Sequence, residues 1–262
     1  KQTQPARQAQ PPQYQQQPSP LTIEKIADGI YQVKGGSGAN CGVIIGEKEV
    51  MVIDAKMSEE SAKQMLAEIG KLTPVPVRVL AFTHSDGDHV NGITGFPADI
   101  KIWAHEETKR YMEEAFKEEK QRAYLPLIKT FASGGPEYDL SGRKVQLLYF
   151  GPAHTSGDAV VFCPQEKVAF LGDLFFAGRD PLVHRHKNGS SFGLVKVLNS
   201  VLQLDAEVFL SGHAEKATRA DVENLIKSIE DKQTQIKAMI AEGKPLDEVK
   251  KFYKIEDRPA AP

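Results

Sequence analysis

Four side chains that can bind a metal ion fall within six residues of this chain. They are His84, Asp86, Asp88 and His89, and they follow the apolar stretch VRVLAFT. Imidazole nitrogens and carboxylate oxygens are ligands that zinc and related divalent cations take in proteins. Because a loop at the end of a strand can bring such side chains together, the cluster indicates a metal site. A polar turn with a helix cap from Asp88 or Asn91 is the alternative explanation.

Three more residues of the same kind stand where later predicted strands end. His154 lies in GPAHTSGD between two strands, Asp173 ends the strand VAFLGD, and His213 follows the strand EVFLSG. A single histidine or aspartate at a strand end usually forms an ordinary hydrogen bond. Three of them, added to the earlier cluster, favour one shared metal site over unrelated hydrogen bonds.

The elements that must position these residues follow from the periodicity of the apolar side chains. Antiparallel strands are predicted for three short β-branched runs, 29–35, 41–46 and 50–55. Apolar residues at helical spacing after a serine cap predict a helix over 58–70 that ends at a glycine. The strand predicted over 77–83 comes next and delivers His84.

The second half of the chain repeats this pattern of strands followed by helices. Predicted strands cover 100–104, 145–150, 159–164, 168–173 and 207–212, and predicted helices cover 105–122, 192–204 and 220–242. The stretch through Pro126 and Gly134-Gly135-Pro136 is predicted to be irregular, either a solvated loop or a lid over the substrate. Two groups of strands, each followed by helices, predict two sheets packed face to face with helices outside.

The order of four motifs along the chain resembles the motif series of the metallo-β-lactamase superfamily. The motifs are T-H-x-x-x-D-H-x-x-G, A-H-T-x-G-D, L-G-D and S-G-H, and the similarity runs from about Ile30 to His213. The resemblance implies an α/β fold for residues 21–262. This fold is an αββα sandwich of two mixed β-sheets flanked by helices, with metal ions at the edge of the sheets.

The resemblance also implies a role for each of the seven candidate ligands. His84, Asp86 and His154 would hold one metal ion, Asp88, His89 and His213 would hold the other, and Asp173 would bridge both. Two zinc ions are the expected cofactor. Metals about 3.5–4 Å apart lower the pKa of a shared water molecule and polarise a substrate oxygen. Asp88 is the candidate catalytic residue, because the resemblance places it beside that water, where it can carry a proton.

Asp86 departs from the superfamily pattern, which usually has a second histidine at this position. A carboxylate binds zinc, but its negative charge lowers the Lewis acidity of the metal and favours harder ions such as manganese or iron. Iron and manganese are therefore alternative cofactors. If Asp86 does not bind metal, the chain has one complete site and one weak or empty site.

Several polar residues near the motifs have predicted supporting roles. Thr83, Thr155 and Asp158 are predicted to fix the tautomers of the histidine ligands or merely to close turns.

Three histidines fall outside the motif series. His105 is predicted to cap or pack the helix that it opens. His184 and His186 lie on a basic loop that either meets an anionic substrate or is simply solvated.

Composition narrows the class of protein. A net charge of −2 gives no basic field for nucleic acid or an anionic membrane, and no apolar run is long enough to cross a bilayer. Cys41 and Cys163 stand in apolar stretches and are predicted to be buried core thiols.

Residues 1–20 are rich in Gln and Pro, which predicts a disordered leader. This leader, with Lys1 in place of a starting methionine, favours a periplasmic or secreted protein over a cytoplasmic one.

A metal-dependent hydrolase is the function that these features predict, acting on a small-molecule ester, thioester, lactone or amide. Nothing beyond the shared scaffold points to a β-lactam substrate. The sequence has no nucleotide-binding glycine fingerprint and no G-x-S-x-G nucleophile motif. Two alternatives stay open: a mononuclear iron dioxygenase that acts on persulfides, and a non-hydrolytic metal-binding protein with a degenerate first site.

Overall fold

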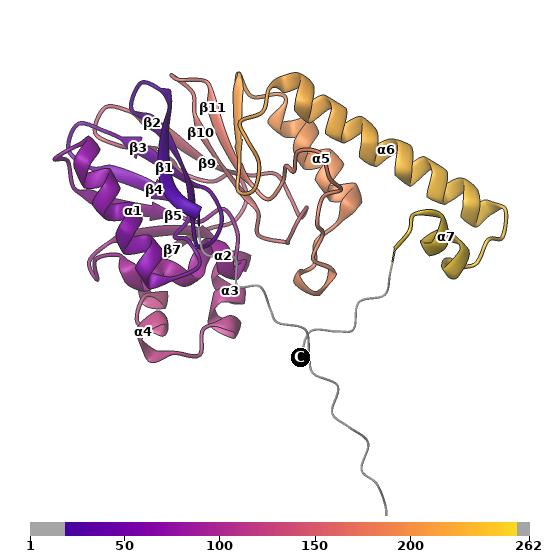
Figure 1. Cartoon of the computed structure of the whole chain (residues 1–262), viewed down its shortest axis with the longest axis horizontal. Helices are drawn as coiled ribbons and strands as arrows, with labels where there is room; N and C mark the ends of the chain where they lie inside the picture. The colour runs from indigo at the N-terminus through magenta and orange to yellow at the C-terminus, as the bar shows by residue number, and fades with distance from the viewer. Residues whose placement is uncertain (1–18, 256–262) are drawn as a thin grey trace, which may run out of the picture.

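Seven strands form the first of two β-sheets in the computed structural model, which describes residues 19–255 (Figure 1). In spatial order they are β1 (Ser19–Ala27), β2 (Ile30–Gly36), β3 (Cys41–Ile45), β4 (Val50–Ile53), β5 (Val77–Ala81), β6 (Lys101–His105) and β7 (Ile128–Phe131). The first four strands pair antiparallel, because short turns connect them. The strands from β4 to β7 pair parallel, because longer crossovers with helices connect them.

Five strands form the second sheet. In spatial order they are β12 (Val208–Ser211), β11 (Val168–Gly172), β10 (Ala159–Cys163), β9 (Lys144–Tyr149) and β8 (Glu137–Asp139). β11 and β12 pair parallel and the other neighbours pair antiparallel, so this sheet is mixed like the first. β10 and β11 are buried along their whole length, which is why both are continuous apolar runs in the sequence.

Helices cover the outer faces of both sheets. The first sheet carries α1 (Glu59–Leu72) and α3 (Glu106–Ala115), and the second carries α5 (Ser191–Val201) and α6 (Arg219–Ala241). One apolar core lies beneath α1 and α3, a second lies between the sheets, and a third lies beneath α5 and α6. These four layers confirm the predicted αββα sandwich.

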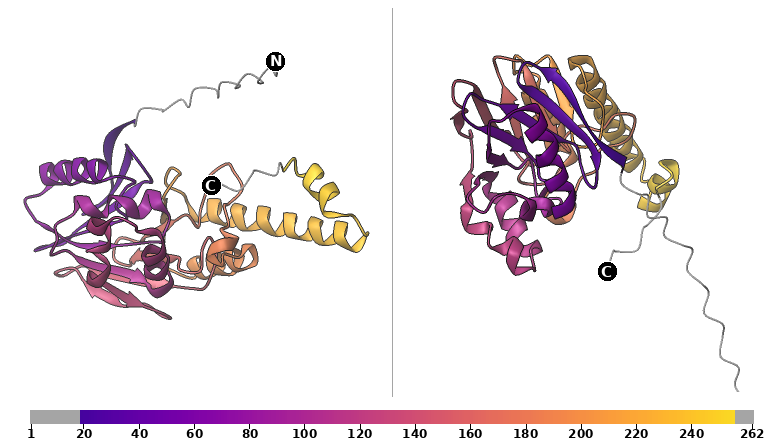
Figure 2. Two further views of the ribbon diagram at one scale, coloured as in Figure 1. Left: turned by 90° about the horizontal axis from the view of Figure 1, so that it is seen from below. Right: turned by 60° about the vertical axis from the view of Figure 1, so that its left-hand side comes forward.

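Shorter helical elements occupy the connections. They are α2 (Gly87–Val90), η1 (Asn91–Gly95), α4 (Glu119–Arg122), η2 (Leu125–Leu127), η3 (Arg185–Lys187) and α7 (Leu246–Phe252). The long helix α6 extends beyond the sheets, and α7 folds back toward it (Figure 2). Just after α7, the Tyr253 hydroxyl donates a hydrogen bond to the side chain of Gln235 in α6. Within residues 19–255, every helix is too short or too polar to cross a membrane.

Two predicted helices have different bounds in the structure. α1 does not end at Gly70 but continues to Leu72, because the Thr73 N–H still reaches the carbonyl of Ile69, at 3.2 Å. The charged stretch 105–122 is not one helix but two, α3 and α4. They separate at Phe116, whose extended backbone turns its ring into the core.

The stretch predicted to be irregular contains two strands, so that prediction is wrong for β7 and β8. Each lies at the edge of one sheet and has only three or four residues, too few to give a clear alternating pattern. The chain enters β8 through Gly135, which has a φ of +57°. A side chain does not fit at this position, because a Cβ would lie 1.4 Å from the carbonyl oxygen of Leu147.

The predicted leader and the domain meet slightly earlier than expected. β1 begins at Ser19, which pairs with Gly36, so the last two residues of the predicted leader 1–20 belong to the first sheet. The rest of the predicted leader lies outside the described residues, and its disorder and the expected export stay predictions.

α7 was not predicted, because its single buried apolar residue, Val249, gives no helical stripe.

Two glycines are expected to respond to alanine in opposite directions. Gly70→Ala is expected to raise the free energy of unfolding by about 0.5–1 kcal/mol, because alanine favours the helical backbone more than glycine does. A Cβ at Gly70 meets no atom within 4 Å. Gly92→Ala is expected to lower it by about 1–3 kcal/mol, since a Cβ there would lie 2.0 Å from the carbonyl oxygen of Ala55. Urea unfolding of both variants measures the two shifts, and shifts of the same sign would contradict this packing.

Candidate metal centre

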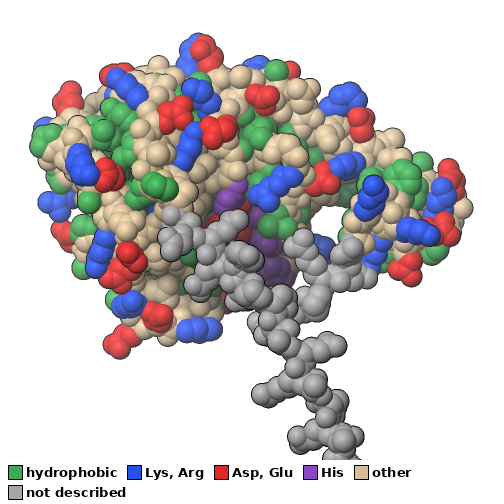
Figure 3. Space-filling model, viewed as in Figure 1, with side chains coloured by type: hydrophobic (Ala, Val, Ile, Leu, Met, Phe, Trp, Pro, Cys, Tyr) green, Lys and Arg blue, Asp and Glu red, His purple; other side chains and the backbone are tan. Residues whose placement is uncertain are grey.

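All seven predicted ligand residues lie at one edge of the two sheets. The segment after β5 provides His84, Asp86, Asp88 and His89 from the first sheet, and the loops after β9, β11 and β12 provide His154, Asp173 and His213 from the second. In the space-filling view, purple histidine side chains lie at the bottom of a recess in the middle of the face (Figure 3). The structure therefore brings together residues from both halves of the chain.

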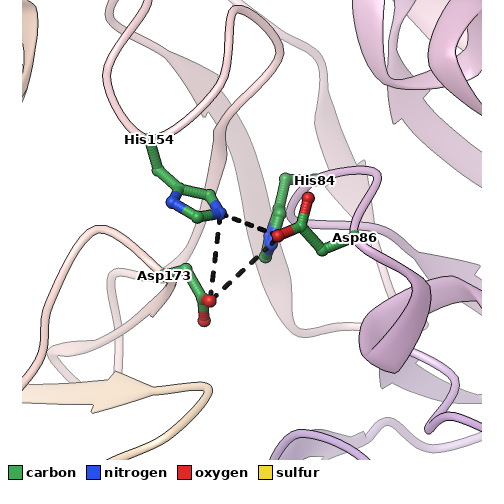
Figure 4. A group of neighbouring side chains, drawn as sticks. All are labelled: His84, Asp86, His154 and Asp173. Atoms are coloured by element: carbon green, nitrogen blue, oxygen red, sulfur yellow. Dashed lines mark hydrogen bonds and ion pairs between the residues drawn. The ribbon is translucent and has the colours of Figure 1, made fainter. Parts of the chain in front are cut away.

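His84, Asp86, His154 and Asp173 form the first group of candidate ligands (Figure 4). Asp86 Oδ2 lies 3.1 Å from His154 Nε2 and 3.7 Å from His84 Nε2. Asp173 Oδ2 lies 3.9 Å from each of these two nitrogens. Ligand atoms at 2.0–2.1 Å from a tetrahedral zinc ion lie roughly 3.3–3.4 Å from one another. The four side chains thus enclose a space close to that size.

Asp88, His89 and His213 form the second group. His213 Nε2 lies 3.0 Å from Asp88 Oδ2, and His89 Nε2 lies 3.8 Å from the same oxygen. Asp173 also reaches this group, since its Oδ1 lies 3.2 Å from His89 Nε2 and its Oδ2 lies 3.4 Å from His213 Nε2. Asp173 therefore stands between the two groups, at the place that a bridging ligand would occupy.

Three buried atoms of the two groups make no hydrogen bond within the part of the chain that the structure describes. They are His84 Nε2, His89 Nε2 and Asp173 Oδ1. Buried polar atoms without a partner are rare, because each loses its hydration without compensation. A cation would supply the missing partner for all three, so the donor set fits a metal ion.

For three of the histidines, His84, His89 and His154, the other ring nitrogen contacts a neighbouring group that fixes the orientation of the ring. His84 Nδ1 lies 3.0 Å from Thr83 Oγ1, which confirms the predicted supporting role of Thr83. His154 Nδ1 lies 2.8 Å from the carbonyl oxygen of Leu182. Because a carbonyl accepts only, the His154 Nδ1 carries the proton and its Nε2 is free to bind a cation when the ring is neutral.

Asp54 is a supporting residue that the sequence reasoning missed. Its carboxylate accepts hydrogen bonds from the backbone N–H and hydroxyl of Thr83, each at 2.8 Å, and from His89 Nδ1 at 2.7 Å. Asp54 is buried at the end of β4 and has a φ of +65°, a conformation that costs free energy for a residue other than glycine. Its place at the end of the apolar strand VMVIDA was the available signal, as it was for Asp173.

Thr155 and Asp158 do not hold a histidine ring, so their predicted ring-orienting role is wrong. The Asp158 carboxylate accepts hydrogen bonds from the backbone N–H of Thr155, at 2.8 Å, and from its hydroxyl, at 2.6 Å. These contacts close the turn that carries His154, which was the alternative prediction.

The electrostatics of the site follow from the paired charges of its side chains. Burial alone would raise the pKa of Asp86, but contacts with His154, His184 and His84 outweigh it and hold that pKa well below the usual range. Hydrogen bonds to Asp173 and Asp88 raise the pKa of His213 to about 9. A cation that binds His213 therefore displaces a proton from it at neutral pH.

The histidines outside the motif series take different positions. His105 Nδ1 accepts a hydrogen bond from the Glu107 N–H at 3.2 Å, and its ring stacks on Tyr149, which confirms the capping and packing prediction. His184 Nε2 lies 2.8 Å from Asp86 Oδ2, whereas His186 is exposed and contacts the His184 ring. Of the two loop histidines, only His184 thus contacts a candidate ligand.

The cysteines are buried and unpaired, as predicted. Burial raises the pKa of Cys41 to about 11 and that of Cys163 to about 12, so both stay thiols at neutral pH.

Comparison with known families and structures agrees with this geometry. Residues 35–213 match the family model described as "Metallo-beta-lactamase superfamily". The fold is similar to that of a metallo-beta-lactamase from Pontibacter korlensis, with a TM-score of 0.70 and 18% identity over 80% of this chain and 99% of the other.

Several proteins of known activity are similar in sequence. A 2,4-dinitroanisole O-demethylase subunit alpha from a Nocardioides species is 26% identical over 81% of this chain and 63% of its own length. Hydroxyacylglutathione hydrolase GloC from Haemophilus influenzae is 30% identical over 53% of this chain and 68% of its own. Metallo-beta-lactamase type 2 from Elizabethkingia meningoseptica is 29% identical over 60% of this chain and 64% of its own. The match to the demethylase subunit thus leaves more than a third of that relative uncovered.

Proposed function

The chain belongs to the metallo-beta-lactamase superfamily, and on that basis we propose that it is a metal-dependent hydrolase of a small ester, thioester, lactone or amide. The observation that carries the proposal is a set of three buried atoms, His84 Nε2, His89 Nε2 and Asp173 Oδ1, which make no hydrogen bond within the described residues and lie among two groups of candidate ligands. Hydrolases occur among the similar proteins, which supports the type of reaction.

Both groups are proposed to hold a metal ion, with Asp173 shared between them. The superfamily binds metal ions, and zinc is proposed here because each group offers two imidazole nitrogens. Three carboxylates in the same space make manganese or iron the alternatives. When bound, such cations lower the pKa of a water molecule and polarise the oxygen of the substrate that water attacks.

Asp88 is proposed to carry the proton of the attacking water. Its Oδ2 contacts His213 Nε2, and its side chain is 24% exposed, so it lies beside the candidate ligands and is also accessible to solvent. In hydrolysis, water adds to the carbonyl carbon and loses a proton, and the leaving group gains one when its bond breaks. A carboxylate at this place can accept the first proton and deliver the second.

A cavity of about 640 Å³ next to the site is proposed to hold the substrate. The Phe176 ring lines this cavity and stacks on the His213 ring, with 5.9 Å between their centroids and an angle of 10° between their planes. A cavity of this size fits a small molecule. An aromatic wall beside a candidate ligand would place the apolar part of a substrate near the metal.

The proposal predicts that the purified protein contains metal and hydrolyses at least one small electrophile. Elemental analysis gives the metal content. Initial rates are then measured on a phenyl ester, a glutathione thioester, a lactone, a β-lactam, an alkyl sulfate and an aryl methyl ether, before and after chelation. We expect turnover of an ester, thioester, lactone or amide that chelator abolishes and zinc restores.

Three other outcomes would overturn the hydrolase proposal. Turnover that survives complete removal of metal would show that the seven residues do not act through a cation. Bound iron with oxygen uptake on glutathione persulfide would identify a dioxygenase. Tight metal binding without turnover of any substrate would favour the non-hydrolytic metal-binding protein.

A further inference from the structure

Two basic residues, Lys187 of η3 and His184 just before it, hold the carboxylate of Asp86. Lys187 Nζ donates a hydrogen bond to Asp86 Oδ1 at 2.7 Å, and it also contacts the carbonyl and hydroxyl oxygens of Ser85, at 3.3 and 3.2 Å. His184 Nε2 lies 2.8 Å from Asp86 Oδ2. One oxygen of Asp86 thus faces the ammonium group of Lys187. The other faces the histidines of the first group, as Figure 4 shows.

The backbone around η3 is fixed to the loop of His154. The N–H of His184 donates to the carbonyl of His154 at 2.8 Å, and the N–H of Ser156 donates to the carbonyl of Lys187 at 2.9 Å. Gly189 passes so close that a Cβ there would lie 2.3 Å from the His154 carbonyl oxygen. Lys187 and His184 therefore approach Asp86 from a segment held in place by one of the candidate ligand loops, rather than from a free surface loop.

The charges of Asp86 and Lys187 offset one another in a little-exposed place. Their side chains are 13% and 18% exposed, so water screens the pair only partly. A histidine at position 86 would be neutral, whereas an aspartate adds one negative charge to the first group. The ammonium group of Lys187 returns the local charge to that of a three-histidine group.

We propose that Lys187 and His184 are positioning residues that make Asp86 equivalent in charge to a histidine ligand. Lys187 cancels the charge of the carboxylate and occupies Oδ1, while His184 fixes Oδ2 toward the first group. The proposal rests on the proposed metal site, but not on any particular substrate. It implies that the effect of changing residue 86 on the zinc affinity of the first site depends on which residue stands at position 187.

A double-mutant cycle tests this dependence through zinc affinity instead of turnover. Asp86→His, Lys187→Met and the double variant are titrated with zinc in competition with a chromophoric chelator, after removal of metal from the purified protein. The binding step that Asp86→Ala weakens is assigned to the first site. Asp86→His is expected to weaken that step at least about tenfold, because Lys187 is left as an unpaired cation beside the metal.

The double variant is expected to recover the affinity of the parent, since its net charge is again the same. Lys187→Met alone is expected to leave zinc affinity within about threefold of the parent, because the carboxylate is then unopposed but loses the contact that holds its Oδ1. It is expected to shift the preference of the site toward manganese. Circular dichroism confirms that each variant is folded.

A matched pair of histidines tests the second contact. His184→Ala is expected to weaken the first site about 10–100-fold, the usual loss when a residue that holds a ligand is removed. His186→Ala, which changes an exposed histidine of the same segment, is expected to leave the zinc affinity of the first site unchanged.

Several results would overturn the inference. Asp86→His with zinc affinity equal to or above that of the parent would show that Lys187 does not compensate the charge. Lys187→Met with the same effect in both backgrounds would show that the two residues are independent. Equal losses in His184→Ala and His186→Ala would remove the positioning role of His184. If no variant and no parent protein binds zinc, manganese or iron, the proposed function fails as well.

Discussion

Alanine at position 173 is expected to weaken both metal sites and to lower turnover by more than about 100-fold. Removal of an outer residue that merely holds a ligand costs about 10–100-fold in affinity or activity, and loss of a shared ligand should exceed it. Asp173 contacts His89 and His213 of the second group as well as His84 and His154 of the first. Zinc stoichiometry and turnover of Asp173→Ala, measured on the same preparation, give the result.

His105→Ala is the control for this experiment. His105 is also a buried polar residue, but it caps α3 and stacks on Tyr149, away from the candidate ligands. Its loss is expected to cost about 0.5–2 kcal/mol of stability, as for other helix caps, with metal content unchanged. Near-normal turnover and full metal content in Asp173→Ala would show that the residue is not a shared ligand.

Asp54→Ala is expected to combine a loss of metal affinity with a large loss of stability. The substitution leaves the backbone N–H and hydroxyl of Thr83 and Nδ1 of His89 without their acceptor in a buried place. Removing one partner from a buried charged network typically costs about 3–5 kcal/mol. Because His89 then loses its orientation, the second site is expected to bind zinc about 10–100-fold more weakly.

Asp158→Ala provides the matched comparison for Asp54. Both carboxylates are buried and accept hydrogen bonds from a threonine, but within residues 19–255 the hydrogen bonds of Asp158 stay within its own turn. Both variants should therefore be less stable by urea unfolding, while only Asp54→Ala should bind the second zinc more weakly. Equal zinc affinities in the two variants would show that Asp54 has a purely structural role.

The sequence was sufficient to predict most of the fold, because the central strands and long helices have clear periodicity. β10 and β11 are continuous apolar runs, and α6 carries a long apolar stripe with a capping box at Thr218. The edge strands β7 and β8 were missed because they are short and half exposed, and only their pairing defines them. Pairing partners far along the chain are not visible in local composition.

The same limit applies to the candidate site. Its seven ligand-type residues were found because each has the right chemistry and stands at a strand end. The residues that hold them were not found, because those contacts join distant parts of the chain: Asp54 is 35 residues from His89, and Lys187 is 101 residues from Asp86. The supporting role of Thr83 was predicted because this residue adjoins His84 in sequence.

Each candidate metal group takes side chains from both β-sheets, so metal binding is expected to couple the local unfolding of one sheet to that of the other. A cation that joins His84 to His154, or His89 to His213, would be a cross-link between the two halves of the sandwich. Amide hydrogens of β5 and β11 would then exchange with solvent in one cooperative event in the metal-loaded protein. After chelation the halves lose that link, and each sheet is free to exchange at its own rate.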